Sequence, residues 1–268
     1  MVGSPFRAEP WLQIPSKKIF EKFSDFASQK SIFCIVVYVE KKRERPQKES
    51  EHMREYHKIE TVFERSTDGN KYLQLGKFRN PTVEFLKDLP WQFTEKLDGT
   101  NTRVYWDGHK VSYGGRTDRA QMPVPLMNYL VSVFGTQEVE ELFEQTFGER
   151  EVILFGEGYG PKIQNGGAYR DDVSFMLFDV LIGDNYQPRE MVEETAKMFG
   201  IDVVPIVCEG TIQDGIDFVT SHPKSTMGTA MMEGVVGRPA VELRDRCGNR
   251  VIVKIKWKDF KYFAGKEE

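Results

Sequence analysis

Hydrophobic and polar positions alternate in short runs over most of the chain from residue 57 onward. The runs are rich in β-branched and aromatic residues and are separated by Asp-Gly, Gly-Gly and Gly-Asn turn signals, a pattern typical of half-buried strands. The predicted strands are 58–63, 91–97, 102–108, 109–115, 151–158, 174–182, 202–210 and 250–257.

Other stretches between these runs repeat apolar residues with a helical period, which indicates one apolar face per helix. The predicted helices are 124–135, 138–148, 188–200 and 212–222. Pro188 near the start and Gly200 past the end of the third helix suit the preferences of helix termini. Because the helices are inserted among strands without strict alternation, we expect an α+β fold of antiparallel sheets with helices on their outer faces.

The first 56 residues differ from the rest. A Lys-rich, partly helical-looking run precedes the apolar nonamer at 31–39 and a charge run at 41–58. We expect residues 1–56 to be a charged, partly disordered N-terminal extension and residues 57–268 to form the folded domain. The basic KKRER at 41–45 could contact phosphates, but a solvated linker is the commoner role of such a run.

Composition excludes several classes of protein. Of 268 residues, 40% are hydrophobic, which is ample for a core, and the net charge of -4 gives no global basic field. Cys34, Cys208 and Cys247 lie far apart, and the four histidines form no metal-binding pair. The apolar nonamer is shorter than the ~18 to 20 residues of a membrane span. We therefore expect a cytoplasmic protein without a membrane partner.

The stretch EKLDGTN at 95–101 places Lys96 at the end of a predicted strand, before an Asp-Gly turn. A lysine there usually belongs to an ordinary hairpin. A free lysine has a pKa of ~10.4, so it becomes a nucleophile only where nearby cations and partial burial favour the neutral amine. Nucleotidyl transfer also needs carboxylates for a divalent metal and cations for the phosphate oxygens.

Three further motifs supply such groups. Glu157 follows the apolar strand EVILF between glycines that allow a ribose to approach closely. Glu233 opens EGVVG, and Lys254 and Lys256 share one face of the strand VIVKIKW because their spacing is two. Each motif alone fits a flexible loop, a strand with a charged first residue, or an edge strand protected by lysines. Their order and spacing together favour a site.

The ordered set resembles the covalent nucleotidyltransferase superfamily of ATP-dependent ligases and mRNA capping enzymes, over about residues 57–260. The matching motifs are KLDG at 96–99, FGEG at 155–158, FMLFDV at 175–180, EGVV at 233–236 and KIK at 254–256. The resemblance implies the nucleotidyltransferase (ATP-grasp-like ligase adenylation) fold, with antiparallel sheets flanked by helices around an ATP cleft. Thr100-Asn101 after KLDG, and Arg116 in GGRTDR, are similar to the nick-sealing RNA ligase family.

The resemblance also implies residue roles. Lys96 is expected to form a lysyl-AMP intermediate, and Glu233 to bind the catalytic Mg²⁺ or Mn²⁺. The expected nucleotide contacts are Glu95 at the adenine edge, Asn101 and Arg116 at the α-phosphate or the RNA 5'-phosphate, Glu157 at the ribose, Phe178 stacked on adenine, and Lys254 and Lys256 at the phosphates.

The implied activity is ATP-dependent RNA ligation: lysyl-AMP formation, AMP transfer to an RNA 5'-phosphate, and sealing by a 3'-hydroxyl. Nicked or broken RNA is the expected partner, and DNA is a second candidate. Twelve residues follow Lys256, too few for the C-terminal OB-fold of DNA ligases and capping enzymes, so an accessory end-recognition protein is a further candidate partner. A DNA ligase, a capping-type guanylyltransferase and an inactive nucleic-acid-binding relative are the alternatives.

Overall fold

A computed structural model describes residues 53–69 and 71–261 of the chain. The larger of its two main sheets has six strands in the order β10-β8-β7-β5-β6, with β9 paired to β8. Its strands are β5 (Thr100–Trp106), β6 (Val111–Gly115), β7 (Val152–Tyr159), β8 (Ser174–Ile182), β9 (Asn185–Tyr186) and β10 (Asp202–Val203).

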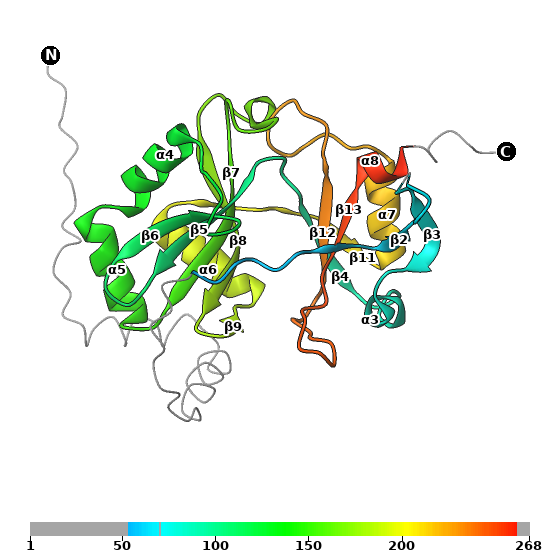
Figure 1. The fold of residues 1–268 in the computed structure, drawn as a ribbon, viewed down its shortest axis with the longest axis horizontal. Coiled ribbons are helices and arrows are strands. Elements are labelled where there is room, and N and C mark those ends of the chain that lie inside the picture. The colour runs from blue at the N-terminus through cyan, green and yellow to red at the C-terminus, as the bar shows by residue number, and fades with distance from the viewer. Residues whose placement is uncertain (1–52, 70, 262–268) are drawn as a thin grey trace, which may run out of the picture. The chain divides into compact units, whose positions relative to one another are not determined.

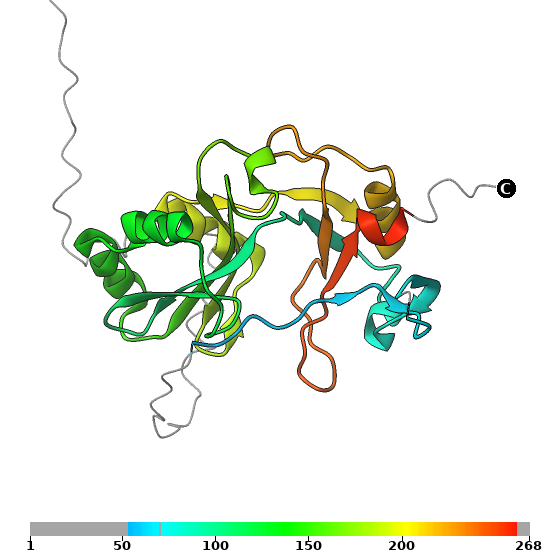
Figure 2. The ribbon, with the colours of Figure 1, turned by 45° about the horizontal axis from the view of Figure 1, so that its top comes forward.

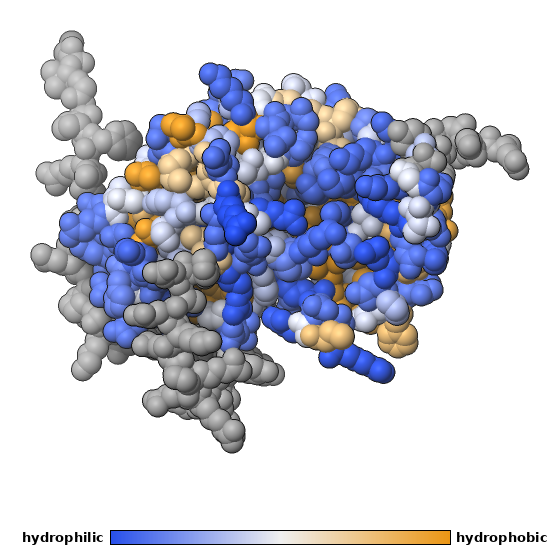
Figure 3. Space-filling model, in the orientation of Figure 1, coloured by the Kyte–Doolittle hydropathy of each residue, from blue (hydrophilic) through white to orange (hydrophobic). Residues whose placement is uncertain are grey.

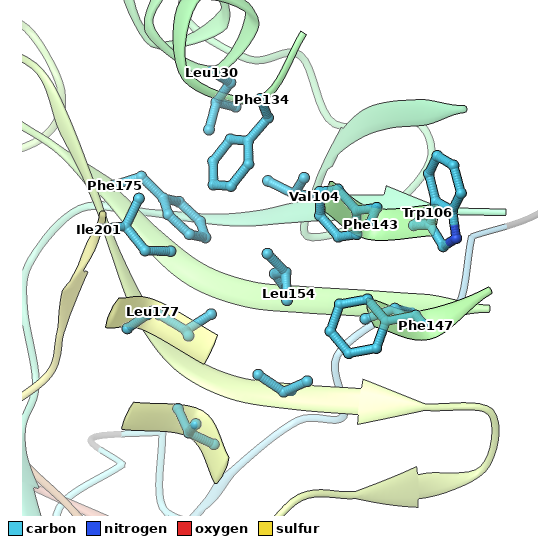
Figure 4. Packing of buried hydrophobic residues seen from close by; sticks show 14 of the residues in the cluster. Val104, Trp106, Leu130, Phe134, Phe143, Phe147, Leu154, Phe175, Leu177 and Ile201 are labelled. Carbon is cyan, nitrogen blue, oxygen red and sulfur yellow. The ribbon is translucent and has the colours of Figure 1, made fainter. Parts of the chain in front are cut away.

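Three helices pack on one face of the larger sheet: α4 (Val124–Phe134), α5 (Gln137–Phe147) and α6 (Arg189–Phe199). Figure 4 shows apolar side chains of α4 and α5 directed at the strands, with Phe134 near Phe175 and Phe143 beside Trp106. The Trp106 and Phe143 rings are stacked, with centroids 5.5 Å apart. The apolar helix faces that the sequence predicts are therefore buried against the sheet.

The smaller main sheet has five strands in the order β1-β13-β12-β4-β11. These are β1 (Glu60–Thr61), β4 (Trp91–Glu95), β11 (Ile206–Gly210), β12 (Gly234–Pro239) and β13 (Val253–Lys256). Helix α7 (Ile212–Thr220) packs on it. The apolar residues between this sheet and α7 form one buried cluster. The cluster also includes residues of the two-stranded ribbon of β2 (Phe63–Arg65) and β3 (Leu73–Phe78), and of the short helices α3 (Pro81–Phe85) and α8 (Trp257–Phe260).

The α+β prediction is confirmed. All four predicted helices are present with ends within two residues of those expected. Most strand pairs are antiparallel, and the parallel pairs in the described residues are β1 with β13 and β10 with β8. No described helix is both long and apolar enough to cross a membrane. In the view of Figure 3 hydrophilic residues predominate and the hydrophobic ones form small patches.

Some predicted strand boundaries were wrong. The single strand predicted at 202–210 is two strands, β10 in the larger sheet and β11 in the smaller one. Pro205 lies between them and has no N–H for a ladder bond, so the chain passes from one sheet to the other there. The strand predicted at 58–63 is likewise divided between β1 and β2, and β3 and α3 were not predicted.

Residues 1–52 lie outside the described part, and with them most of the predicted N-terminal extension. The extension is described only from Met53 to Tyr56. Tyr56 is buried in an aromatic cluster with Phe155, and its hydroxyl donates to Asp179 Oδ2 at 2.5 Å. These last residues before position 57 therefore pack against the larger sheet.

A buried ionic network joins the two main sheets. Asp179 of β8 is fully buried and accepts hydrogen bonds from Arg238 of β12 and Arg250, each at 2.8 Å. Burial opposes ionisation of Asp179, but the two guanidinium groups outweigh it and lower the pKa of the carboxyl. Glu242 pairs with the other edge of Arg250 at 2.5 Å, so the network satisfies most of its charges internally.

Candidate active site

Lys96 directly follows β4, the strand between β12 and β11 in the smaller sheet. Its backbone N–H donates to Gly234 O at 2.9 Å, which extends the pairing of β4 with β12 by one bond. Its side chain is one quarter exposed, and Nζ lies 2.5 Å from Glu233 Oε2. The predicted nucleophile is therefore held at a strand end and remains partly accessible.

Glu233 joins Lys96 to Lys256. It precedes β12, and Gly234 pairs with Lys256 in the antiparallel register of β12 and β13. This register brings Lys256 Nζ to 2.5 Å from Glu233 Oε1. Burial disfavours the charged carboxylate, but the two lysines outweigh burial and lower the pKa of Glu233. The carboxylate is thus held as an anion between two cations.

Lys254 provides a third cation. Burial alternates along β13 as the sequence predicts, so Lys254 and Lys256 share a face while Val253 and Ile255 are buried on the other. Burial, reinforced by the charges of Lys256 and Lys96, lowers the pKa of Lys254. Three lysines close together, two of them paired with Glu233, supply positive charge that suits phosphate groups.

Glu157 and Asn101 lie opposite each other in the pairing of β7 with β5. Glu157 Oε1 accepts from the Gly99 N–H at 3.2 Å. Burial raises the pKa of the Glu157 carboxyl to about 7, against the opposing effects of Lys96 and the Gly99 N–H. The Asn101 side-chain oxygen is buried and has no hydrogen-bond partner among the described residues. Such an acceptor is costly unless a ligand supplies a donor.

The Asp-Gly turn of KLDG packs against the end of β7. A Cβ on Gly99 would lie 2.4 Å from Gly158 O and 2.9 Å from the Glu157 side chain. Only glycine fits this approach, which brings the residues after Lys96 beside Glu157. The ordinary turn and the candidate site are therefore the same feature.

Phe178 is the extra residue of a β-bulge in β8. In the register with β7, Phe155 pairs with Asp179 and Gly156 pairs with Leu177, which leaves Phe178 between them. The half-buried ring lies edge-on to Tyr56 with centroids 5.0 Å apart, and it also packs against the cluster that contains Leu97. A bulge re-aims side chains in this way, often at functional sites.

Glu95 has its carboxylate inside the smaller sheet. It is almost fully buried and accepts from the Ser225 hydroxyl at 2.5 Å, the Thr226 N–H at 3.0 Å and the Thr226 hydroxyl at 2.6 Å. The structure thus gives it the loop after α7 as its partner. Its predicted contact with adenine stays a prediction.

Arg116 is exposed just after β6. Thr102 pairs with Gly115 at the end of β5 and β6, so one further step in this register places Arg116 opposite Asn101. The loop is held by Arg103, a fully buried arginine whose guanidinium donates to Gly115 O at 2.6 Å. The two predicted phosphate contacts therefore come from neighbouring strand ends.

Several residues around Lys96 were not predicted. The Asp98 N–H donates to the Tyr169 hydroxyl at 3.2 Å, and the Asn165 side-chain amide donates to the Asp98 carboxylate. Asn165 and Tyr169 belong to a loop in which two non-glycine residues, Lys162 and Gln164, have positive φ. Such strained positions gather at functional sites, and periodicity cannot reveal them.

The donor set suits a divalent ion that is shared with a substrate. The described residues contain no group of three or more His, Cys, Asp or Glu that could hold a metal by themselves. Magnesium often binds through one or two carboxylates together with substrate phosphates. Glu233, accompanied by three lysines, fits that mode of binding better than a dedicated protein cage.

This fold and this arrangement of lysines and carboxylates define the nucleotidyltransferase class. The RNA ligase family model matches residues 89–256, more than half of the chain. The chain therefore belongs to the RNA ligase family. No curated protein matches it significantly.

Among solved structures, the chain is similar to RNA ligase from Naegleria gruberi. A mutant with ATP and Mn has a TM-score of 0.52 at 17% identity and aligns over 69% of this chain and 54% of that one. The ligase with PPi has a TM-score of 0.52 at 19% identity and aligns over 70% of this chain and 55% of that one. A further mutant with ATP and Mn has a TM-score of 0.53 at 16% identity and aligns over 76% of this chain and 61% of that one. The chain thus shares their fold and spans about half their length.

Proposed function

We propose that this chain is an ATP-dependent RNA ligase that works through a covalent lysyl-AMP intermediate on Lys96. The contact of Lys96 and Lys256 with the two oxygens of Glu233, each at 2.5 Å, carries the proposal. It joins three of the predicted site residues at the ends of β4, β12 and β13. Membership of the RNA ligase family, together with the similarity to Naegleria ligase structures with ATP and Mn or with PPi, supports ATP and a divalent metal as cofactors.

In the first step, the neutral amine of Lys96 attacks the α-phosphorus of ATP. A nitrogen–phosphorus bond forms, the bond to pyrophosphate breaks, and the amine proton is lost. Lys254 and Lys256 neutralise the phosphate oxygens. Glu233 would hold a divalent ion at this site, and the ion would supply further charge neutralisation.

The nucleoside binds on the larger-sheet side of the site. Phe178 offers an aromatic surface for adenine, and Glu157 offers a carboxyl group for the ribose hydroxyls. Because the pKa of Glu157 is about 7, this carboxyl can accept or donate a hydrogen bond near neutral pH. The unpartnered Asn101 oxygen supports a polar ligand at the same strand ends.

In the second step, an RNA 5'-phosphate oxygen takes AMP from Lys96, and the nitrogen–phosphorus bond breaks. In the third step, a 3'-hydroxyl attacks that 5'-phosphorus and AMP leaves. Arg116 and Asn101, at adjacent strand ends, are the proposed contacts of the 5'-phosphate. Arginine suits this role because its planar fork donates two parallel bonds to phosphate.

Incubation with α-labelled ATP and Mg²⁺ or Mn²⁺ tests the first step. The wild-type chain is expected to form a covalent protein-AMP adduct, and Lys96→Ala is expected to form none. Lys197→Ala, on the distant helix α6, is the matched control and should retain the adduct. Absence of an adduct with the wild type, or an undiminished adduct with Lys96→Ala, would contradict the proposal.

Parallel labelling with GTP and sealing assays on matched RNA, DNA and hybrid nicks separate the alternatives. Preference for ATP and for RNA ends is expected. Labelling from GTP in preference to ATP would instead indicate a capping-type guanylyltransferase. Efficient sealing of an all-DNA nick, with little sealing of RNA, would indicate a DNA ligase.

A further inference from the structure

A hollow opens beside Glu233. Its volume is about 300 Å³. Of the described residues that line it, Glu233 alone belongs to the set predicted to bind ATP or metal; the walls come from the loop before β8, the loop before β12, and the start of α8. The first two loops lie side by side in Figures 1 and 2. The hollow therefore shares Glu233 with the candidate ATP and metal site, but its other lining residues are different.

One wall is an aromatic pair. The His222 and Trp257 rings are stacked with centroids 4.2 Å apart and planes 11° apart. His222 has a φ of 50° just after α7, and its N–H donates to Val219 O. Glycine is the usual residue at such a left-handed position after a helix. A histidine there is strained, and that strain favours a functional over a structural role for its ring.

This wall is tied to the reacting groups. The Trp257 N–H donates to Glu233 O at 3.0 Å, and Trp257 directly follows Lys256. Asp98, two residues after Lys96, also lines the hollow. A molecule in the hollow therefore lies next to the atoms that form and break bonds.

The hollow is already formed by hydrogen-bonded loops. Ser225 N–H donates to Ala230 O at 2.9 Å, and Thr229 N–H donates to Ala168 O at 3.3 Å, which links the two loops. Glu95 anchors the loop before β12 from beneath through Ser225 and Thr226. A preformed pocket binds a ligand with little loss of loop entropy.

The lining indicates which end of a nucleic acid fits. Aromatic rings and the side chains of Met231 and Met232 suit a nucleobase. The lining includes one lysine, Lys258, and two carboxylates, Asp98 and Glu233. Glu233 is already paired with Lys96 and Lys256, whereas Asp98 offers acceptor oxygens that suit sugar hydroxyls and repel a phosphate. An RNA strand that ends in a free 3'-hydroxyl presents a nucleoside of this kind.

We propose that this hollow binds the 3'-terminal nucleoside of the acceptor strand, with its base against the His222–Trp257 pair and its hydroxyls toward Asp98 and Glu233. The proposal rests on the proposed RNA ligase function and assigns the end recognition of its last step. In that step the 3'-oxygen bonds to the 5'-phosphorus, the phosphorus bond to AMP breaks, AMP leaves with the electron pair, and the hydroxyl proton passes to water.

The test uses a pre-adenylylated RNA strand beside an acceptor strand, so that sealing does not depend on ATP. His222→Gly removes the ring and relieves the strained backbone, so the variant should fold at least as well as the wild type. We expect its sealing rate at low acceptor concentration to fall about tenfold more than its adduct formation with ATP, through a higher KM for the acceptor. His109→Gly, at an exposed turn, is the control and should seal normally.

An acceptor whose terminal nucleotide lacks its base gives the decisive comparison. With the wild type, loss of the base should cost about tenfold in sealing; with His222→Gly, it should cost little more, because the contact is already absent. Equal losses in both proteins would overturn the proposal, as would wild-type sealing that ignores the base, or no sealing of this substrate at all. Absence of the ATP adduct alone counts only against the proposed lysyl-AMP chemistry.

Discussion

At the scale of single residues, Glu157 has the property that periodicity could least predict. Its sequence position, between two glycines after an apolar strand, suggested contact with a ribose. Its pKa of about 7 follows from burial at the β5 and β7 ends, which outweighs Lys96 and the Gly99 N–H. A glutamate with a raised pKa in the folded state binds its proton more tightly there than in the unfolded chain.

Glu157 therefore makes stability depend on pH in a defined direction. Its favourable contribution is fully present below its unfolded pKa of about 4.5 and is lost as pH rises to about 7. Glu157→Gln has no carboxyl to ionise and so removes this loss. The unfolding free energy of the variant minus that of the wild type should therefore be more than about 1 kcal/mol larger at pH 8 than at pH 5. Urea denaturation at both values measures it.

Glu144→Gln, on the exposed face of α5, is the control for Glu157→Gln and should change the pH dependence little. A stability difference between Glu157→Gln and the wild type that is the same at both pH values would contradict the raised pKa.

At the scale of elements, the β5–β6 hairpin depends on a buried arginine. Arg103 donates to Gly115 O, to Met53 O at 2.5 Å and to Asp118 Oδ1 at 2.9 Å. It lies opposite Gly114, where a Cβ would be 3.0 Å from Nη2, so glycine makes room for the guanidinium. The loop that carries Arg116 is thus fixed by a side chain from the neighbouring strand.

Arg103→Lys should destabilise the chain by about 2–3 kcal/mol, because one ammonium cannot reach three acceptors and leaves buried carbonyl oxygens unpaired. Urea unfolding measures the cost. Arg119→Lys, exposed four residues after Gly115, should cost less than about 0.5 kcal/mol. A cost for Arg103→Lys as small as this would mean that water replaces the guanidinium in the hairpin.

At the scale of the whole described unit, the candidate site needs both main sheets. Lys96, Glu233 and the lysines of β13 come from the smaller sheet, whereas Glu157 and Phe178 come from the larger one. Asp179 lies next to Phe178 and binds Arg238 of β12 and Arg250, which precedes β13. The ionic network that joins the sheets therefore also fixes the bulge at Phe178.

Asp179→Asn should be severely destabilising, by about 3–5 kcal/mol, because it leaves two arginines without their buried counter-charge. Asp172→Asn, which breaks an exposed pair with Arg170, should cost far less. Chemical denaturation at pH 7 compares them. Similar costs for the two variants would show that the sheets do not depend on this network.

The lowered pKa of Asp179 also makes the stability of the folded chain depend on pH in acid. Its contribution to stability is present above its unfolded value near 3.8 and is lost as pH falls through the lower folded value. Asp179→Asn should therefore lose less stability than the wild type on acidification below about pH 4.

Local pattern was enough to predict the type of most elements, although β3 and α3 were missed. The helix ends at Gly200 and the alternation along β13 follow from period and turn chemistry, which report the burial of one face and little else. Ordered local motifs, and the family resemblance that they carry, selected the candidate site residues, whose roles remain predictions.

Only the tertiary structure decided which residues meet. Lys96 and Glu233 are 137 positions apart, and their contact depends on the register of β4, β12 and β13. The same holds for the crossing at Pro205, the bulge at Phe178 and the Glu95 contacts with Ser225. The hydrophobic period of the sequence cannot predict these contacts, because many strand pairings satisfy the same local pattern. The packing of two sheets through a buried ionic network selects one of these pairings.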